Sequence, residues 1–263
     1  MPDNLILGLA AGYHFDDVRP FLRSLERTGF SGRLVLFVSD TTRDLERMSE
    51  TGAEIIPFAR SAELRDVPYN ALRYFLYRDY LHGSGETYRR ILFTDVRDVV
   101  FQSDPFAFNW PASVNAALEA PGALMGKCPH NSRWARNHLG AEALERMRDK
   151  TVSCSGTTVA DHEGALDYLE AMTERLTPVP QGERMAGYVQ AVHNLLVHAD
   201  LLPNLALIDN DGPIYTLGQV EGAPELDSDG FVLNRLGRRP AIVHQYDRKP
   251  NLHRTLRRKY GPL

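Results

Sequence analysis

Short apolar runs alternate with segments of helical periodicity through roughly the first hundred residues. The apolar runs cover residues 5–10, 33–38, 54–58 and 90–94, and each has the length and composition of a strand buried in a sheet. Between them, apolar side chains recur at helical spacing in residues 18–25, 45–48 and 71–81. This alternation of strands and helices predicts right-handed βαβ units and a parallel sheet.

The second half of the chain is less regular. We predict helices at residues 110–118, 141–149, 164–175 and 185–198, a strand or loop crossing at 152–159, and short strands at 205–208 and 241–243. Neither an internal repeat nor a low-complexity linker divides the sequence. We therefore expect one α/β domain over residues 1–263, with a Rossmann-like, mostly parallel central sheet flanked by helices.

The composition is that of an ordinary globular protein, with 43% hydrophobic and 24% charged residues. A net charge of -4 argues against a nucleic-acid partner, because phosphate binding needs a basic surface. Residues 248–259 form a basic exception. They are either a solvated tail or a contact for an anionic ligand or a membrane surface.

The sequence contains neither a signal peptide nor the roughly 20 consecutive apolar residues of a spanning helix. We therefore expect a cytoplasmic protein, at most peripheral to the membrane through the basic segment. The two cysteines, Cys128 and Cys154, are expected to be free thiols because no zinc or redox spacing joins them. A disulfide between them is the alternative.

The most informative stretch is RILFTDVRDVVFQSDPF, residues 90–106. Its apolar strand leads directly into Asp95 and Asp98, and ligands of parallel sheets bind at the carboxyl ends of the strands. Carboxylates there suit a hard divalent cation such as Mn²⁺ or Mg²⁺, which neutralises a diphosphate leaving group. The alternative is that these aspartates cap the next element or pair with Arg97.

Residues 93–106 resemble the D-x-D region of GT-A glycosyltransferases, in particular the glycogenin-like enzymes of family 8. Asp98 and Asp104 match the second aspartate of the motif and a later one. Asp95 matches the first aspartate with one residue inserted, so that Val96 stands at the strict D-x-D position. The resemblance implies a GT-A fold and a metal ion held by Asp95 and Asp98.

A second match lies near the C-terminus, where residues 241–250 read AIVHQYDRKP. By resemblance, His244 is the third metal ligand, Lys249 acts on the donor phosphate in catalysis, and Arg248 assists it. Imidazole is a good Mn²⁺ ligand, and lysine acts as a point charge on phosphate. The alternative for His244 is a histidine of the core or of a strand end.

A late helix and a small-residue loop complete the match. Gln190 and Asn194 correspond to catalytic positions of the family, although Val189 replaces an expected aspartate. A loop of small residues is implied to lie under the donor sugar, and here it contains Ser155, Gly156 and Thr157. The alternative for that loop is a strand with a bulge.

Further candidates for nucleotide binding follow the first strands and line one helix face. After the first strand, small residues leave space for a ligand and an aromatic ring suits a nucleobase; these residues are Ala10, Ala11, Gly12 and Tyr13. Asp40 ends the second strand and either binds the nucleotide or caps a helix. Arg73 and Tyr77 share a helix face, and in related enzymes an arginine on this helix reaches the donor.

The segment with Lys127, His130 and Trp134 is a candidate lining of an acceptor cleft.

We therefore expect a metal-dependent glycosyltransferase that moves a sugar from a nucleotide diphosphate sugar to a hydroxyl acceptor. The resemblance implies a UDP-sugar donor and retention of anomeric configuration. Residues 1–106 would bind the nucleotide sugar, and the irregular residues 107–263 would form the acceptor side and close the metal site.

Other functions make different demands on the sequence. A nucleotidyltransferase on the same sheet would carry a basic, glycine-rich loop after the first strand, and a phosphohydrolase would place an aspartate there. A dinucleotide oxidoreductase would show G-x-G-x-x-G, which this chain lacks. A non-catalytic module that binds a sugar or nucleotide is the alternative outside enzymes.

Overall fold

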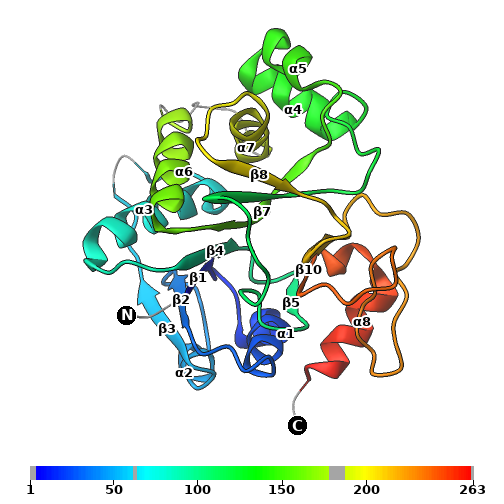
Figure 1. Ribbon diagram of the computed structural model, residues 1–263. Coiled ribbons are helices and arrows are strands. Elements are labelled where there is room, and N and C mark those ends of the chain that lie inside the picture. Colours follow the sequence, from blue (N-terminus) through cyan, green and yellow to red (C-terminus); the bar gives the residue numbers. More distant parts are fainter. Residues whose placement is uncertain (1–3, 62–63, 178–186, 262–263) are drawn as a thin grey trace.

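The chain folds as an α/β protein built on a seven-stranded mixed sheet, with a small three-stranded sheet beside it (Figure 1). The computed structural model describes residues 4–61, 64–177 and 187–261. The large sheet has the strand order β3-β2-β1-β4-β7-β6-β8. Its strands are β1 Asn4–Leu9, β2 Arg33–Val38, β3 Ala53–Pro57, β4 Arg90–Thr94, β6 Val114–Leu118, β7 Ser153–Ala160 and β8 Leu205–Ile208.

The first half follows the predicted βαβ pattern. Strand β1 pairs in parallel with β2 and β4, and β2 pairs in parallel with β3. The predicted helices are confirmed as α1 Phe15–Glu26, α2 Leu45–Ser49 and α3 Tyr69–Ser84. Helix α1 starts with a capping box in which the backbone N–H of His14 donates to the Asp17 carboxylate, which satisfies a donor that the helix leaves unpaired.

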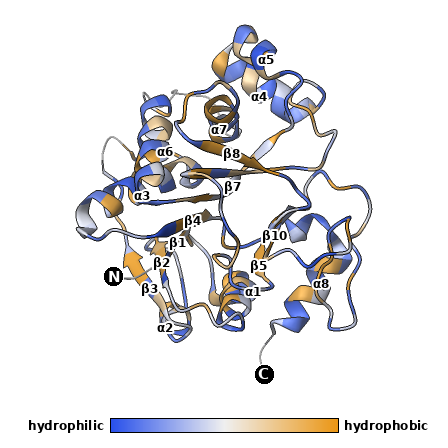
Figure 2. Cartoon of the chain, viewed as in Figure 1, coloured by the Kyte–Doolittle hydropathy of each residue, from blue (hydrophilic) through white to orange (hydrophobic). Residues whose placement is uncertain are grey.

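Alternating side chains give the large sheet two buried faces. On one face, Leu5 and Leu7 of β1 pack with α3, α6 His162–Arg175 and α7 Tyr188–His198. On the other face, Ile6 packs with α1 and the small sheet. Figure 2 shows apolar strands between helices whose outer faces are polar. Burial on both faces explains why these strands appear in the sequence as continuous apolar runs.

The predicted helix at residues 110–118 is wrong. Residues Val114–Leu118 form β6, which pairs with β7 on one edge and β8 on the other. The buried Asn115 side chain donates to the carbonyl oxygens of Ala112 and Val159. The alanine-rich segment has helical propensity, but pairing on both edges within a buried sheet outweighs that weak local preference.

Other elements of the second half agree with the prediction or add to it. Helices α5 Ala141–Met147 and α6, and strands β7, β8 and β10 Ile242–His244, lie where they were expected. Helix α7 begins at Tyr188, and the first two residues of its predicted range, 185 and 186, lie outside the described residues. Helix α4 Pro129–Leu139 and strand β9 Ile214–Thr216 were not predicted. Because β7 runs antiparallel to β4 and β6, the sheet is mixed.

The small sheet has β10 at its centre, antiparallel to β5 Val99–Phe101 and parallel to β9. Helix α8 Pro250–Lys259 packs on it through Leu252 and Leu256 (Figure 1). Within the basic segment, Arg257 donates to the carbonyl of Asp16, and Lys259 donates to the carbonyls of Asp229 and Gly230. Most of this segment is therefore a docked helix.

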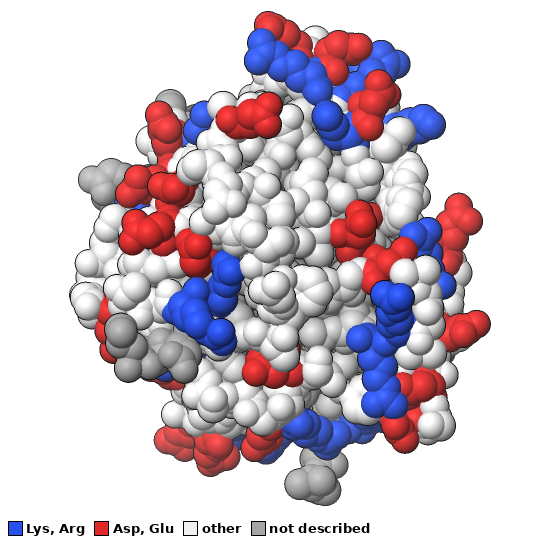
Figure 3. Space-filling view, viewed as in Figure 1, with Lys and Arg blue, Asp and Glu red and all other residues white. Residues whose placement is uncertain are grey.

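Charged side chains of both signs surround a largely uncharged centre on the face shown in Figure 3. This face therefore presents mixed charge. Within residues 4–61, 64–177 and 187–261, every helix is too short or too polar to cross a membrane.

Candidate metal centre and adjoining cavities

Three predicted ligands converge where β4, β5 and β10 end or begin. Asp95 follows β4, Asp98 precedes β5, and His244 ends β10. Their ligand atoms lie within 4.8 Å of one another. His244 Nε2 is 3.4 Å from Asp95 Oδ2 and 3.9 Å from Asp98 Oδ1. Two carboxylates and an imidazole at these distances form a group that can hold a metal ion.

The inserted residue of the acidic motif, Val96, packs into the core between the two aspartates. Val96 is buried, and a Cβ on Gly8 of β1 would lie 2.4 Å from its Cγ1. Gly8 therefore leaves the space that Val96 fills. Because Val96 occupies the core, Asp95 and Asp98 converge despite the extra residue, and the pairing of β10 with β5 brings His244 to them.

The surroundings of His244 fit the role of a metal ligand. Its imidazole is fully buried, and Nε2 has no hydrogen-bond partner within the described part of the chain. Its Nδ1 lies 3.8 Å from Cys154 Sγ. A Cβ on Gly156 would lie 2.4 Å from His244 Cε1 and 2.6 Å from Asp95 Oδ2, so glycine keeps both ligands in place. A buried polar atom without a partner calls for an explanation, and a divalent cation here would supply one.

Charge is distributed unequally over the three ligands. Burial raises the pKa of Asp98 to about 6 against the opposing effect of His244, and the Asp95 carboxylate adds to the rise. Burial alone would raise the pKa of Asp95, but Arg73 and His244 hold it well below its usual range. Burial opposes protonation of His244, but Cys154 and the two carboxylates raise its pKa. The group therefore attracts positive charge, which a metal ion supplies by displacing a proton.

Arg73 of α3 is the buried cation of the site. It is 7% exposed, and its guanidinium donates to the Asp95 carboxylate and to the backbone oxygen of Ser155 at 2.9 Å. It also donates to the hydroxyl of Tyr74 at 3.1 Å. Arg73 thus joins helix α3 to the ends of β4 and β7, and it brings a permanent positive charge to the metal group.

Two cavities open on either side of Arg73 and Asp95. The sheet-edge cavity, about 310 Å³, is lined by Ala11, Tyr13, Tyr69, Arg97, Asp98 and neighbouring residues. The central cavity, about 570 Å³, is lined by Glu119, Trp134, Cys154, Ser155, Gln190 and others. They share Asn70, Arg73, Asp95, Gln245 and Arg248. Asp95 therefore lies at the junction of two spaces, each within the about 300–1,000 Å³ range of ligand pockets. Asp98 lines the sheet-edge cavity alone, and the buried His244 lies behind the two carboxylates and lines neither cavity.

Several predicted site residues line these cavities. Ala11 and Tyr13 face the sheet-edge cavity, and Arg248 lines both cavities. Gln190 lines the central cavity and accepts hydrogen bonds from the backbone N–H of Ser155 at 3.0 Å and from its hydroxyl at 2.9 Å. His130 and Trp134, the candidates for an acceptor cleft, also line the central cavity.

Other predicted site residues are buried in the core and are not among the lining residues of either cavity. Asn194 is buried and bonds both backbone groups of Ser153. Tyr77 is buried and stacks on Phe93. Thr157 is buried in β7. These side chains therefore shape the site from within the core.

The remaining candidates lie in loops and are not among the lining residues of either cavity. The backbone N–H of Gly12 donates to the hydroxyls of Ser39 at 3.0 Å and Thr42 at 3.1 Å, and Ala10 is buried. Asp40 is exposed at the end of β2. Lys249 donates to the backbone oxygen of Val220, so in this conformation its ammonium group is directed to a loop.

Glu119 is the carboxylate of these two cavities that the sequence analysis missed. It follows β6, lines the central cavity and is 6% exposed. Its Oε2 is buried without a hydrogen-bond partner in the described residues. Burial raises its pKa to about 7, although His244 and Arg248 oppose this rise. The position was missed because residues 110–118 were predicted as a helix; a strand there would have placed Glu119 at the ligand edge.

Replacing Glu119 by glutamine is expected to stabilise the protein at pH 8 and not at pH 4. A buried carboxyl whose pKa is raised in the folded protein lowers the free energy of unfolding once the pH exceeds the pKa of the unfolded chain, near 4.3. The penalty grows with pH until the carboxyl is also ionised in the folded state. The gain of Glu119→Gln should therefore reach about 1–3 kcal/mol at pH 8. Urea unfolding at both pH values measures it. The control is Glu221→Gln, at an exposed position, which should change stability by less than about 0.5 kcal/mol. An equal effect of Glu119→Gln at both pH values would contradict the raised pKa of Glu119.

Comparison with known proteins assigns no family to this chain. A scan against protein-family models and a search of curated proteins both find no match. The geometry of the site and the motifs that it contains are therefore the basis for a functional assignment.

Proposed function

We propose that this protein is a metal-dependent glycosyltransferase of the GT-A type, which moves a sugar from a nucleotide diphosphate sugar to a hydroxyl acceptor. One observation carries the proposal: Asp95, Asp98 and His244 meet at the edge of an α/β sheet, beside two adjoining cavities that share Asp95. A donor of this class has a nucleotide and a sugar joined by a diphosphate. Two adjoining cavities with a cation site between them match these three parts.

Asp95, Asp98 and His244 would hold Mn²⁺ or Mg²⁺. Such an ion, when bound, neutralises the diphosphate and so stabilises it as a leaving group. Carboxylate oxygens suit either ion, and the imidazole favours Mn²⁺ over Mg²⁺.

Cationic side chains of the chain support a diphosphate at the junction. Arg73 and Arg248 line both cavities, and Arg97 lines the sheet-edge cavity. Fixed positive charges stabilise negative charge that develops on the leaving group. Arg248 takes the phosphate-binding role that was expected of Lys249, whose ammonium group binds a backbone oxygen.

The two cavities suit different parts of the donor. In the sheet-edge cavity, Tyr13 and Tyr69 offer aromatic rings to a nucleobase. In the central cavity, Ser155 and Gln190 offer hydroxyl and amide groups to sugar hydroxyls. Gln190 is neutral and is held by Ser153 and Ser155, so it orients the sugar and does not act as a base. This assignment agrees with retention of anomeric configuration.

The proposal is tested by thermal unfolding with UDP, GDP, CDP, TDP and ADP, each in Mn²⁺ or in EDTA. A nucleotide at about 100 times its dissociation constant should add roughly 2.7 kcal/mol of stability. We expect UDP with Mn²⁺ to do so, and we expect Asp98→Asn to abolish the gain because it removes a ligand charge. Asp149→Asn, at an exposed position just after α5, is the control and should keep the full gain.

Turnover then separates an enzyme from a binding module. Release of UDP from a panel of UDP-sugars should require Mn²⁺ and Asp98. Stabilisation without release would favour a binding module, and turnover of nucleoside triphosphates with release of pyrophosphate would favour a nucleotidyltransferase. Absence of any metal-dependent nucleotide effect would overturn the proposal.

A further inference from the structure

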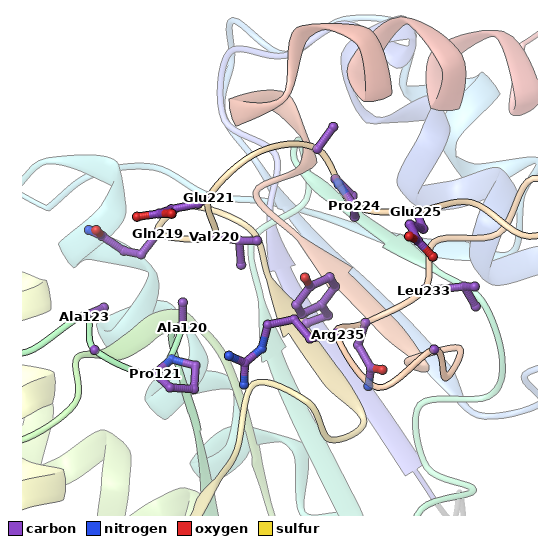
Figure 4. A pocket seen from close by; sticks show the side chains of 15 residues that line it. Ala120, Pro121, Ala123, Gln219, Val220, Glu221, Pro224, Glu225, Leu233 and Arg235 are labelled. Atoms are coloured by element: carbon purple, nitrogen blue, oxygen red, sulfur yellow. The ribbon is translucent and has the colours of Figure 1, made fainter.

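A third and larger cavity adjoins the central cavity and plays no part in donor binding as proposed above. This outer cavity, about 750 Å³, is lined by the loop of residues 120–123, by Tyr215 of β9 and by segments of residues 219–225 and 233–237. Figure 4 shows Arg235 extending across it toward Pro121. Gln219 lines both cavities, and Glu119 of the central cavity precedes Ala120 of the outer one. The three cavities therefore follow one another along the molecule.

Charge changes sign along this series. The sheet-edge cavity is lined by Arg73, Arg97 and Arg248 and also by the metal-site carboxylates Asp95 and Asp98. Arg73 pairs with Asp95 and Arg97 with Asp247, so this cavity is positive overall once a metal ion neutralises the carboxylates. In the central cavity, Glu119 and Asp95 balance Arg73 and Arg248, and in the outer cavity Glu221 and Glu225 stand against Arg235. An anionic group would therefore be attracted to the sheet-edge end and repelled from the outer end.

The single arginine among the residues that line the outer cavity does not reverse this sign. Arg235 forms an ion pair with Asp211, and its Nε lies 3.2 Å from Asp211 Oδ1. Its charge is thus paired, whereas Glu221 and Glu225 are exposed. The outer cavity favours a neutral or cationic ligand.

Glu119 lies in the central cavity next to the outer one, and its Oε2 has no hydrogen-bond partner among the described residues. Its backbone is fixed by an N–H···O bond of 2.8 Å to Val152. Its side chain is 6% exposed, and Oε2 is unpaired in the described part of the chain. A buried carboxylate oxygen without a donor costs free energy, and a ligand hydroxyl entering the central cavity would satisfy it. Trp134, which lines the same cavity, offers an apolar face to a sugar ring.

We propose that Glu119 and the outer cavity form the acceptor site, and that the acceptor is a polyhydroxylated molecule, neutral or cationic, and longer than one sugar ring. Glu119 accepts a hydrogen bond from the acceptor hydroxyl and holds it beside the donor. The outer cavity takes the rest of the acceptor and discriminates against phosphorylated compounds. This inference rests on the proposed glycosyltransferase function.

The test measures binding of neutral disaccharides, namely maltose, cellobiose and lactose, to protein saturated with UDP and Mn²⁺. Saturation-transfer NMR gives the dissociation constants, and the 1-phosphates of the same disaccharides are measured in parallel. We expect at least one neutral disaccharide to bind about tenfold or more tightly than its phosphate. At pH 8, where the Glu119 carboxylate is charged, Glu119→Gln should weaken that binding by about tenfold or more, because a hydrogen bond to a charged group is replaced by one to a neutral amide.

Controls separate a positioning role from a structural one. Glu119→Gln should leave the dissociation constant of UDP with Mn²⁺ within about twofold of the wild type, and its melting temperature should not fall. Glu46→Gln, at an exposed position of α2, should change neither ligand. Glu119→Asp, which keeps the carboxylate on a shorter side chain, should weaken disaccharide binding less than Glu119→Gln.

The outcomes distinguish this inference from the proposed function. If UDP binds with Mn²⁺ but none of the neutral disaccharides binds, or if the phosphates bind more tightly, the acceptor assignment is overturned. Unchanged disaccharide binding in Glu119→Gln also overturns it. If UDP fails to bind, the proposed function fails first, and Glu119-dependent disaccharide binding would then support the cavity as a sugar site of another protein class.

Discussion

Replacing Arg73 by methionine is expected to lower the free energy of unfolding by about 2–3 kcal/mol at pH 7. Methionine fills most of the space but removes the donors to Asp95 and to the carbonyl of Ser155. Breaking a buried ion pair by removing one partner costs about 3–5 kcal/mol. We expect a loss below this range because the Asp95 side chain is 38% exposed, so water can solvate its charge when Arg73 is removed. Urea unfolding in EDTA measures the loss without metal.

The pH dependence of this loss identifies its origin. Arg73 and His244 hold the pKa of Asp95 below its usual range, so the stability that the pair provides is present above the unfolded pKa near 3.9 and decreases as the folded carboxylate is protonated. The difference between wild type and Arg73→Met should therefore shrink below about pH 4. Arg73→Lys keeps the charge without the planar guanidinium, and it should lose less stability. A loss that stays the same size from pH 7 down to pH 2 would show that packing, not charge, is responsible.

The fold of the first half could be predicted because local and tertiary signals agree there. The strands at residues 33–38 and 90–94 are buried on both faces, so they appear as unbroken apolar runs. The second half lacks this agreement. Strand β6 is short and rich in alanine, and only its partners β7 and β8, which follow it in the chain, determine that it is extended.

The candidate site was predictable to the same degree as the elements that carry it. Asp95 and Asp98 follow a strand that was correctly predicted, and Asp98 and His244 lie in motifs of recognisable spacing. Glu119 lies at the end of a strand that was predicted as a helix. Lys249 was placed correctly on the segment after β10, but its side chain is directed to Val220, and a side-chain direction in a loop has no periodic signal in the sequence.

Glycine 156 offers the sharpest steric test of the metal site, since Gly156→Ala adds one methyl group and no charge. Its Cβ would lie 2.4 Å from His244 Cε1 and 2.6 Å from Asp95 Oδ2, and the His244 ring is fully buried. The ring and the carboxylate must therefore move. We expect Mn²⁺ affinity to fall by about 100-fold, at the upper end of losses caused by changes around a metal site, and stability in EDTA to fall by about 1–3 kcal/mol.

The matched control is Gly83→Ala in helix α3, where an added Cβ meets nothing within 4 Å. Alanine there should raise stability by about 0.5–1 kcal/mol, because glycine is a weak helix former, and should leave Mn²⁺ affinity unchanged. Isothermal titration with Mn²⁺ and urea unfolding measure both variants. The methyl group added in Gly156→Ala would meet two of the three ligands. A normal Mn²⁺ affinity in this variant would therefore mean that the ion binds elsewhere. A loss of Mn²⁺ affinity in Gly156→Ala that Gly83→Ala does not show would instead support an ion held by Asp95 and His244.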